Sequence, residues 1–153
     1  MKEFDYYIFI DYSENFVGYL IVSNVQLKIL IPKISRLRHY KDSRNRKLYL
    51  KNVNKMIKRE KIIKLLTKMK IRLMNNNIEI YSDLLEFLRC HEKCIIFISV
   101  DNRQYQAFKK MINLFEGNNI TVKQESELRE GSPEYRISLL IDNLLNIERR
   151  KDA

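Results

Sequence analysis

The stretch IFIDYSENFVGYLIV, residues 8–22, holds two apolar runs separated by the polar residues 13–15. Aromatic and β-branched residues dominate both runs, and such residues favour strands. A connection this short joins antiparallel neighbours, because a parallel return needs a crossover of a dozen residues or more. The stretch therefore predicts a hairpin of two strands, 5–12 and 16–22, with Asp11 near the end of the first strand.

The next apolar segments predict a third strand and a long helix. Residues 25–31 read as a strand that follows a two-residue turn and ends at Pro32, which cannot continue a ladder. Residues 33–52 show no clear period. Apolar residues interleaved with lysines predict a helix over residues 53–74, and three asparagines after it end the pattern.

The rest of the chain alternates helices and strands. A continuous apolar run ahead of Asp101 is typical of a central strand covered on both faces. Ser132 and Pro133 are residues favoured at the start of a helix. The expected elements are a short helix 84–90, the strand 94–100, an amphipathic helix 102–117 that ends at Gly117, a strand 119–124 and a last helix that begins at Pro133.

The predicted order is three strands, helix, strand, helix, strand, helix. It describes an α/β fold with a mixed sheet, in which an antiparallel meander is extended by parallel strands with flanking helices. This is the wiring of the ribonuclease H-like fold; a Rossmann, flavodoxin or PIN domain would place a helix directly after the first strand. With only three glycines and no low-complexity linker, we expect one domain over residues 1–153 with a basic helical insertion at about 33–75.

Basic residues are concentrated in one segment. The formal net charge is +10, and residues 33–75 hold 16 Lys and Arg against two acids, a net charge of +14. Such a block indicates a polyanion partner, nucleic acid before a membrane surface; the alternative is a lysine-rich composition that reflects the source. The predicted nucleic-acid contacts are Arg36, Arg38, Lys41, Arg44, Arg46, Lys47, Lys51, Lys55, Lys58 and Arg59.

Several classes are disfavoured by composition. No window is long and apolar enough for a transmembrane helix, and the charged start of the chain is unlike a signal peptide, so we expect no membrane partner and a cytoplasmic location. The two cysteines, Cys90 and Cys94, do not make a disulfide framework. Their spacing also differs from the C-x-x-C of common zinc motifs, which favours buried thiols over a metal site.

Three aspartates are expected to meet. Asp11 ends the first strand, Asp101 ends the central strand, and Asp142 lies in the last helix. If the two strands are adjacent and parallel, their terminal aspartates share one edge of the sheet, which the last helix crosses. Mg²⁺ prefers carboxylate oxygens and water, and two such ions about 4 Å apart stabilise both oxygens of a phosphoryl transfer. The pattern predicts a two-metal Mg or Mn site with all three aspartates as catalytic and metal-binding residues.

Each of these residues also has a structural interpretation. Asp11 precedes a turn, where Asp is common. Asp101 can cap the helix that follows it, with Gln104 completing a capping box. Asp142 lies on the flank of an apolar stripe, where it can be a solvated acid. Glu134 competes with Asp142 for the third role, although a place near the helix start also suits an acid through the helix dipole.

The carboxylate segments resemble an uncharacterised family of ribonuclease H-like proteins. Members begin with a strand that runs into a D-E-S-G motif, and they end with a helix that carries two apolar residues, A-D and two more apolar residues. IFIDYSENF keeps Asp11 and Ser13, with Tyr12 and Glu14 in place of Glu and Gly. SPEYRISLLIDNLLNIERR matches the second motif, with Asp142 at the acid and isoleucine in place of alanine; IIFISVDNRQ is similar to the family's middle strand.

The resemblance implies a fold family whose enzymes use a metal ion, and it leaves the identity of one acidic residue of the site open. It covers roughly residues 1–30 and 94–153, and it favours Asp142 over Glu134 as the third acid. Enzymes of this superfamily use a fourth acid from a helix between the third and fourth strands. The candidates for it are Glu60, Glu79 and Glu86.

Three functions follow from these patterns. The first is a metal-dependent nuclease or related phosphoryl-transfer enzyme that binds nucleic acid through the basic segment. The second is a non-catalytic nucleic-acid-binding or assembly protein on the same fold. The third is a protein-interaction module that forms a homodimer through the helix 53–74, whose apolar residues would otherwise pack on their own sheet.

Overall fold

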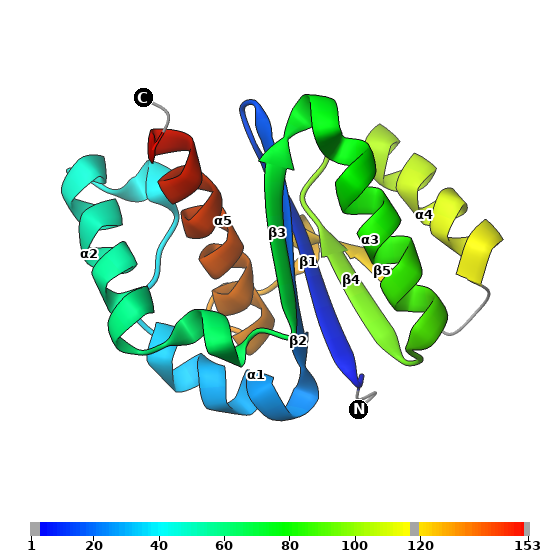
Figure 1. Cartoon of the computed structure of the whole chain (residues 1–153), viewed down its shortest axis with the longest axis horizontal. Coiled ribbons are helices and arrows are strands. Elements are labelled where there is room, and N and C mark those ends of the chain that lie inside the picture. Colours follow the sequence, from blue (N-terminus) through cyan, green and yellow to red (C-terminus); the bar gives the residue numbers. More distant parts are fainter. Residues whose placement is uncertain (1–3, 117–119, 152–153) are drawn as a thin grey trace.

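The computed structural model describes residues 4–116 and 120–151 and has a five-stranded mixed sheet at its centre (Figure 1). The order across the sheet is β3-β2-β1-β4-β5. Strands β1, β2 and β3 are antiparallel neighbours, whereas β4 is parallel to β1 and β5 is parallel to β4. The strands are β1 (Tyr6–Ser13), β2 (Phe16–Ser23), β3 (Lys68–Leu73), β4 (Cys94–Ile98) and β5 (Ile120–Gln124).

Helices cover both faces of this sheet (Figure 1). One hydrophobic cluster joins one face of the sheet to α5, α1 and α2, and a second cluster joins the other face to α3 and α4. Among the described residues, no helix has the length and apolar character needed to cross a membrane. The helices are α1 (Asn24–Leu30), α2 (Arg46–Arg59), α3 (Asn77–Cys90), α4 (Asn102–Glu116) and α5 (Pro133–Lys151).

The alternation of side chains along β1 decides where Asp11 lies. Tyr7 and Phe9 belong to the cluster under α5, and Ile8 and Ile10 belong to the cluster under α3 and α4. Successive residues of a strand face opposite sides, so Asp11 follows Phe9 onto the α5 face. Because β1, β4 and β5 are parallel, their carboxyl ends share one edge of the sheet.

The predicted strand 25–31 is wrong, since residues 24–30 form helix α1. The Ser23 hydroxyl accepts a hydrogen bond from the Gln26 N–H at 3.2 Å, which caps the start of the helix. Leu27 and Leu30 lie three residues apart and are both buried. This spacing fits one face of a helix, although the apolar run also fits a strand. The helix is favoured because its buried residues pack into the same cluster as α5.

The predicted helix 53–74 is also wrong. Helix α2 ends at Arg59, and Lys61 adopts a left-handed conformation with φ 54°, which stops the helical path. The strand β3 then supplies the third member of the antiparallel meander, because it pairs with β2. The expected dimer seam is therefore divided among separate elements: Met56, Leu66 and Met69 pack against the core, and Ile63 is 45% exposed.

The remaining elements agree with expectation apart from their ends. Helix α3 starts at Asn77, seven residues before the predicted helix, and β4 ends at Ile98 instead of residue 100. The last helix begins at Pro133, as predicted. Gly117 and residue 119, the predicted ends of a helix and a strand, lie outside the described residues.

Candidate active site

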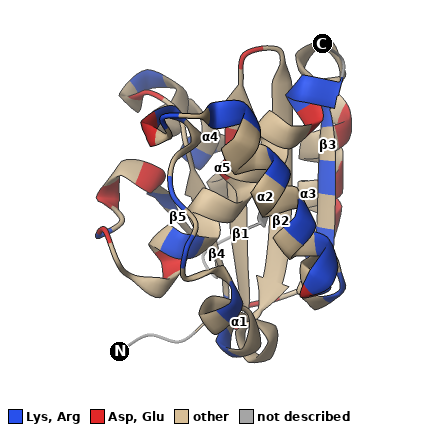
Figure 2. Cartoon of the chain, turned by 90° about the vertical axis from the view of Figure 1, so that its left-hand side faces the viewer, with Lys and Arg blue, Asp and Glu red and all other residues tan. Residues whose placement is uncertain are grey.

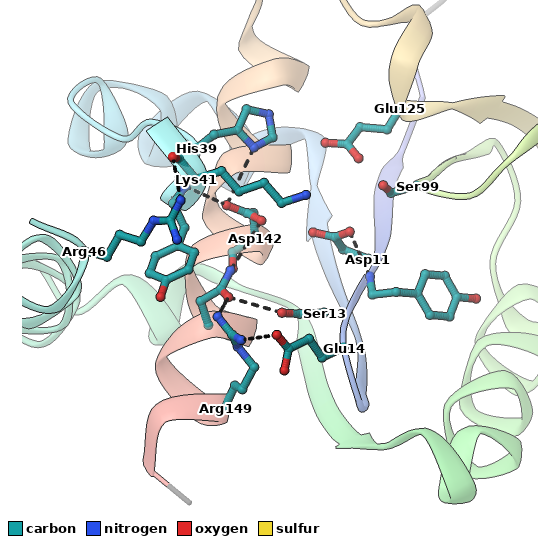
Figure 3. Close-up of a pocket in the computed structure, with 13 residues that line it drawn as sticks. Asp11, Ser13, Glu14, His39, Lys41, Arg46, Ser99, Glu125, Asp142 and Arg149 are labelled. Atoms are coloured by element: carbon teal, nitrogen blue, oxygen red, sulfur yellow. Dashed lines mark hydrogen bonds and ion pairs between the residues drawn. The ribbon is translucent and has the colours of Figure 1, made fainter. Parts of the chain in front are cut away.

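A pocket of about 580 Å³ opens where β1, β4 and β5 end (Figure 3). Strand β1 contributes Asp11 and Ser13, and the residues just after β4 and β5 contribute Ser99 and Glu125. Helix α5 and the segment before α2 form the opposite wall. The residues that line the pocket are Asp11, Tyr12, Ser13, Glu14, His39, Tyr40, Lys41, Arg46, Ser99, Glu125, Asp142, Asn146 and Arg149.

Asp11 is the most deeply buried acid of the pocket, with 7% of its surface exposed. Its Oδ1 accepts a hydrogen bond from the Tyr12 N–H at 2.8 Å. Burial raises the pKa of Asp11 well above its ordinary value, and the negative charges of Glu125 and Asp142 raise it further. Hydrogen bonds from Tyr12 and Ser99 oppose this shift without cancelling it. A cation in the pocket would therefore stabilise the charged form of this side chain.

Asp142 faces the same space from α5, as the sequence predicted (Figure 3). Its Oδ2 accepts a hydrogen bond from the Tyr40 N–H at 3.1 Å and lies 3.7 Å from Nδ1 of His39. Burial raises the pKa of Asp142, while the Tyr40 hydrogen bond and the charges of His39 and Lys41 lower it. The side chain thus ties the segment before α2 to the last helix.

Asp101 lies apart from these two carboxylates. It is exposed, it does not line the pocket, and its Oδ1 accepts a hydrogen bond from the Gln104 N–H at 2.8 Å. The Gln104 Oε1 in turn accepts from the Asp101 N–H at 3.4 Å. This reciprocal pair is the capping arrangement that the sequence also allowed at the start of α4.

Glu125 is a further acid of the pocket, beside Asp11, Glu14 and Asp142, and the sequence reasoning missed it. In Figure 3 its side chain points toward the space between Asp11 and Asp142. The residue directly follows β5, a strand parallel to β4, so it reaches the same edge of the sheet as Asp11. An acid placed just after a predicted strand was the available signal, the same one that drew attention to Asp101.

The acids considered for the remaining roles lie elsewhere. The Glu60 carboxylate is 3.2 Å from the Lys33 ammonium, and the Glu79 carboxylate is 3.3 Å from that of Lys70. Glu86 is exposed on α3. The pocket lining includes none of the four other candidate acids, which are Glu60, Glu79, Glu86 and Glu134.

Cations lie beside the carboxylates. Lys41 extends into the space near Asp142 (Figure 3). The guanidinium carbons of Arg46, Arg149 and Arg150 lie 5.3, 5.5 and 5.3 Å from the centre of the buried Tyr40 ring. All ten cations predicted to contact nucleic acid are exposed, and two of them, Lys41 and Arg46, line the pocket. The pocket therefore joins buried acids to a basic surface.

The donor set suits a hard divalent ion only in part. Asp11 and Asp142 offer carboxylate oxygens, and Mg²⁺ is commonly held by one or two carboxylates with water and substrate phosphates as further ligands. Within residues 4–116 and 120–151, no group of three or more His, Cys, Asp and Glu side chains is arranged to hold a metal ion.

The two cysteines lie outside the pocket lining. Cys90 is exposed and Cys94 is buried, and burial raises the pKa of the Cys94 thiol to about 11.

Comparison with known proteins identifies the fold. No protein-family profile and no curated protein sequence matches the chain. Ribonuclease H2 from Pyrococcus horikoshii OT3 is similar in structure, with a TM-score of 0.58 and 14% identity over 95% of this chain and 72% of that one. The RNase HII of a PCNA complex from Archaeoglobus fulgidus gives a TM-score of 0.57 and 13% identity over the same shares. The chain has a ribonuclease H-like fold, as its predicted wiring indicated.

Proposed function

We propose that the protein is a metal-dependent nuclease or a related phosphoryl-transfer enzyme that acts on nucleic acid. The observation that carries the proposal is the meeting of Asp11 and Asp142 in one pocket, where both have a raised pKa. The structural neighbours are ribonucleases, which supports the same class of reaction.

The carboxylates of Asp11 and Asp142 would hold Mg²⁺ or Mn²⁺. The ion would supply positive charge to the transferring phosphoryl group and to the oxygens around it. Burial makes a charged Asp11 costly, so a bound cation would be favoured there. We assign the third place of the site to Glu125 in preference to Asp101, because Glu125 lines the pocket and Asp101 caps α4.

The basic surface would hold the backbone of the nucleic acid. Figure 2 shows Lys and Arg over α2 and along β3. Lys47, Lys51 and Lys55 recur every four residues and are all exposed, so they form one stripe of α2. Arg46, at the start of this helix, lines the pocket. Charge would thus guide a strand from the stripe toward Asp11 and Asp142.

A non-catalytic nucleic-acid-binding protein is the second candidate. Two observations favour it: the described residues include no cluster of three metal-ligating side chains, and the Lys41 charge lies close enough to Asp142 to lower its pKa. An ammonium group beside the carboxylates would compete with a divalent ion for the same space. Such a protein would bind nucleic acid with a strong dependence on salt and no dependence on Mg²⁺.

Calorimetric titration with Mn²⁺ separates the two candidates. The variants are Asp11→Asn and Asp142→Asn, with Asp101→Asn as the matched control, since Asn caps a helix about as well as Asp. We expect saturable binding by the wild type and by the control, and none by the two pocket variants. Cleavage of labelled DNA and RNA with Mn²⁺ should follow the same pattern. Equal cleavage by wild type and Asp11→Asn would contradict the proposed site, whereas absence of Mn²⁺ binding and of cleavage in the wild type would leave the binding protein.

A further inference from the structure

The pocket beside the carboxylates adjoins a second pocket, and an ion pair between Glu14 and Arg149 lies where they meet. Nη1 of Arg149 lies 2.7 Å from the Glu14 carboxylate. The second pocket has a volume of about 460 Å³ and shares Glu14, Tyr40 and Arg149 with the first. Its other lining residues are Asn15, Phe16, Leu73 and Arg150. The Glu14–Arg149 ion pair therefore lies at the boundary between the two adjoining pockets.

Glu14 has an unusual backbone for its residue type. It lies in the turn between β1 and β2 with φ 50°, in the left-handed region where glycine is favoured. A glycine would adopt this turn without strain, so the side chain is what the glutamate adds at this position. That side chain is 68% exposed, and its ion pair is with Arg149, a residue of the pocket wall.

The guanidinium groups of Arg46, Arg149 and Arg150 lie around the Tyr40 ring. Besides its contact with Glu14, Arg149 donates from Nη2 to the Asn146 Oδ1 at 2.9 Å, which fixes the guanidinium. Arg150 donates from Nε to the Tyr40 hydroxyl at 2.9 Å. Among the described residues, neither Arg46 nor Arg150 pairs with a carboxylate. Planar guanidinium groups match the oxygens of a phosphate, and here three of them surround one ring.

We propose that Arg46, Arg149 and Arg150 form a phosphate-binding subsite beside the carboxylates, and that Glu14 occupies Arg149 as a competing anion in the free protein. The identity of the ligand as a nucleic-acid strand rests on the proposed function. A phosphate of that strand would take the place of the Glu14 carboxylate. The two pockets would then join, and the apolar side chains of Phe16 and Leu73 would lie beside the attached sugar or base.

Displacement of Glu14 is physically reasonable because the glutamate side of the ion pair is exposed to solvent. The Glu14 side chain is 68% exposed and gains little free energy from pairing, since it is well solvated and loses freedom when it pairs. The Arg149 side chain is 24% exposed and keeps its hydrogen bond to Asn146 when Glu14 leaves. A phosphate brings more than one acceptor oxygen to the guanidinium, whereas the contact with Glu14 uses one nitrogen, Nη1. Removal of the Glu14 charge should therefore tighten the binding of any phosphate at this subsite.

The test uses pyrophosphate alone, titrated by calorimetry in EDTA at constant ionic strength. Glu14→Gln should tighten binding roughly two- to fivefold, the range expected when a solvent-exposed carboxylate is removed from a pair. The matched control is Glu60→Gln, which removes the same charge and breaks a comparable pair with Lys33 at 3.2 Å. Arg149→Gln should weaken binding at least as strongly; Arg150→Gln gives the same test if the Arg149 variant fails to fold. Equal affinities of Glu14→Gln and Glu60→Gln would overturn the subsite.

A second titration with a single-stranded oligonucleotide in EDTA tests the identity of the ligand. If the same variants change its affinity in the same directions, the strand assignment is supported. If only pyrophosphate responds, the subsite exists but the assignment to a nucleic-acid strand is overturned. Neither titration contains a divalent ion, so a failure of the proposed metal site would appear in the Mn²⁺ experiment and leave these results unchanged.

Discussion

At the scale of single residues, Asp11 couples folding to pH. Its pKa is raised in the folded protein by burial and by Glu125 and Asp142, and an unfolded Asp has a pKa of about 3.9. The folded state therefore binds more protons than the unfolded state between these two pKa values. The stability is greatest below about pH 3.9 as far as this group is concerned, and it falls as the pH rises through the folded pKa.

Replacement of Asp11 by Asn should raise the stability at pH 7 in metal-free buffer. The gain is about 1.4 kcal/mol for each unit by which the pKa is raised, and each kcal/mol moves the Tm by about 2–4 °C in a chain of this size. The Asn Oδ1 can still accept the Tyr12 N–H. Thermal unfolding from pH 3.5 to pH 8 measures the effect, and the gain should vanish at the acid end. A pH-independent loss of Tm would show that the pKa of Asp11 is not raised in the folded protein.

Gly18 is a second residue on which the site depends. It pairs with Asp11 across the β1–β2 ladder. A Cβ at this position would lie 2.9 Å from Cδ2 of Leu145 and 3.0 Å from Cγ1 of Ile71. The glycine therefore permits the close approach of α5 to the sheet, which places Asp142 opposite Asp11.

Gly18→Ala should lower the free energy of unfolding by roughly 1–3 kcal/mol, the usual cost of overpacking. Urea unfolding measures the change. Leu145→Val removes bulk from the side chain that the new methyl group meets, so the double variant should lose less than the sum of the two single variants. Additive losses would mean that the clash is relieved in another way.

At the scale of elements, the cap of α4 tests the role of Asp101. Asp101→Ala removes the acceptor for the Gln104 N–H and should cost about 1 kcal/mol of stability. Because this residue does not line the pocket, Mn²⁺ binding should keep its affinity. A loss of Mn²⁺ binding in a folded Asp101→Ala variant would restore this residue to the metal site.

Sequence patterns predicted the helices and strands whose type does not depend on tertiary packing. The hairpin of β1 and β2, the buried strand β4 and the start of α5 at Pro133 were predictable from short turns, apolar runs and a helix-start signal. Helix α1 was not, because the four apolar residues of this seven-residue segment fit either period until they pack into the cluster that includes α5. In β3 the alternation of Lys68, Lys70 and Arg72 with apolar residues was a strand signal, and the longer lysine-rich pattern concealed it.

The site was predictable to the same degree. Asp11 and Asp142 could be found because strand ends and the final helix were placed correctly. Tyr40 and Arg149 belong to distant parts of the chain, and only the packing of the segment before α2 on α5 brings them together. Local sequence carries no signal for such a meeting. The capping role of Asp101 was one of two readings that its spacing to Gln104 allowed.

At the scale of the whole molecule, charge is separated from the two cores. The buried residues of α2 are Leu50, Val53 and Ile57, while its cations are exposed. One face of this helix therefore closes a hydrophobic cluster and the other presents a positive surface. Changes to the exposed lysines should alter binding to a polyanion without altering the fold.

Conversion of four α2 lysines to glutamine should flatten the salt dependence of nucleic-acid binding. Each lost phosphate contact reduces the slope of log K against log salt by about 0.7 for a single strand. Fluorescence anisotropy at several salt concentrations measures the slope, and the Tm should stay within a few degrees. An equal effect of the control would assign binding to net charge alone. The test variant changes Lys47, Lys51, Lys55 and Lys58; the control changes the exposed residues Lys28, Lys109, Lys110 and Lys123.

The segment between β2 and β3 leaves the sheet and returns to the same place. It departs after Ser23, and at its end the Thr67 N–H donates to the Ile21 carbonyl at 2.8 Å. Recombination at these two points would preserve every strand pairing while replacing His39, Tyr40, Lys41 and Arg46 in one event. Asp11 and Asp142 lie outside the exchanged stretch. Descendants of this protein could therefore acquire a new ligand preference by inheriting a different segment between β2 and β3, while Asp11 and Asp142 stay unchanged.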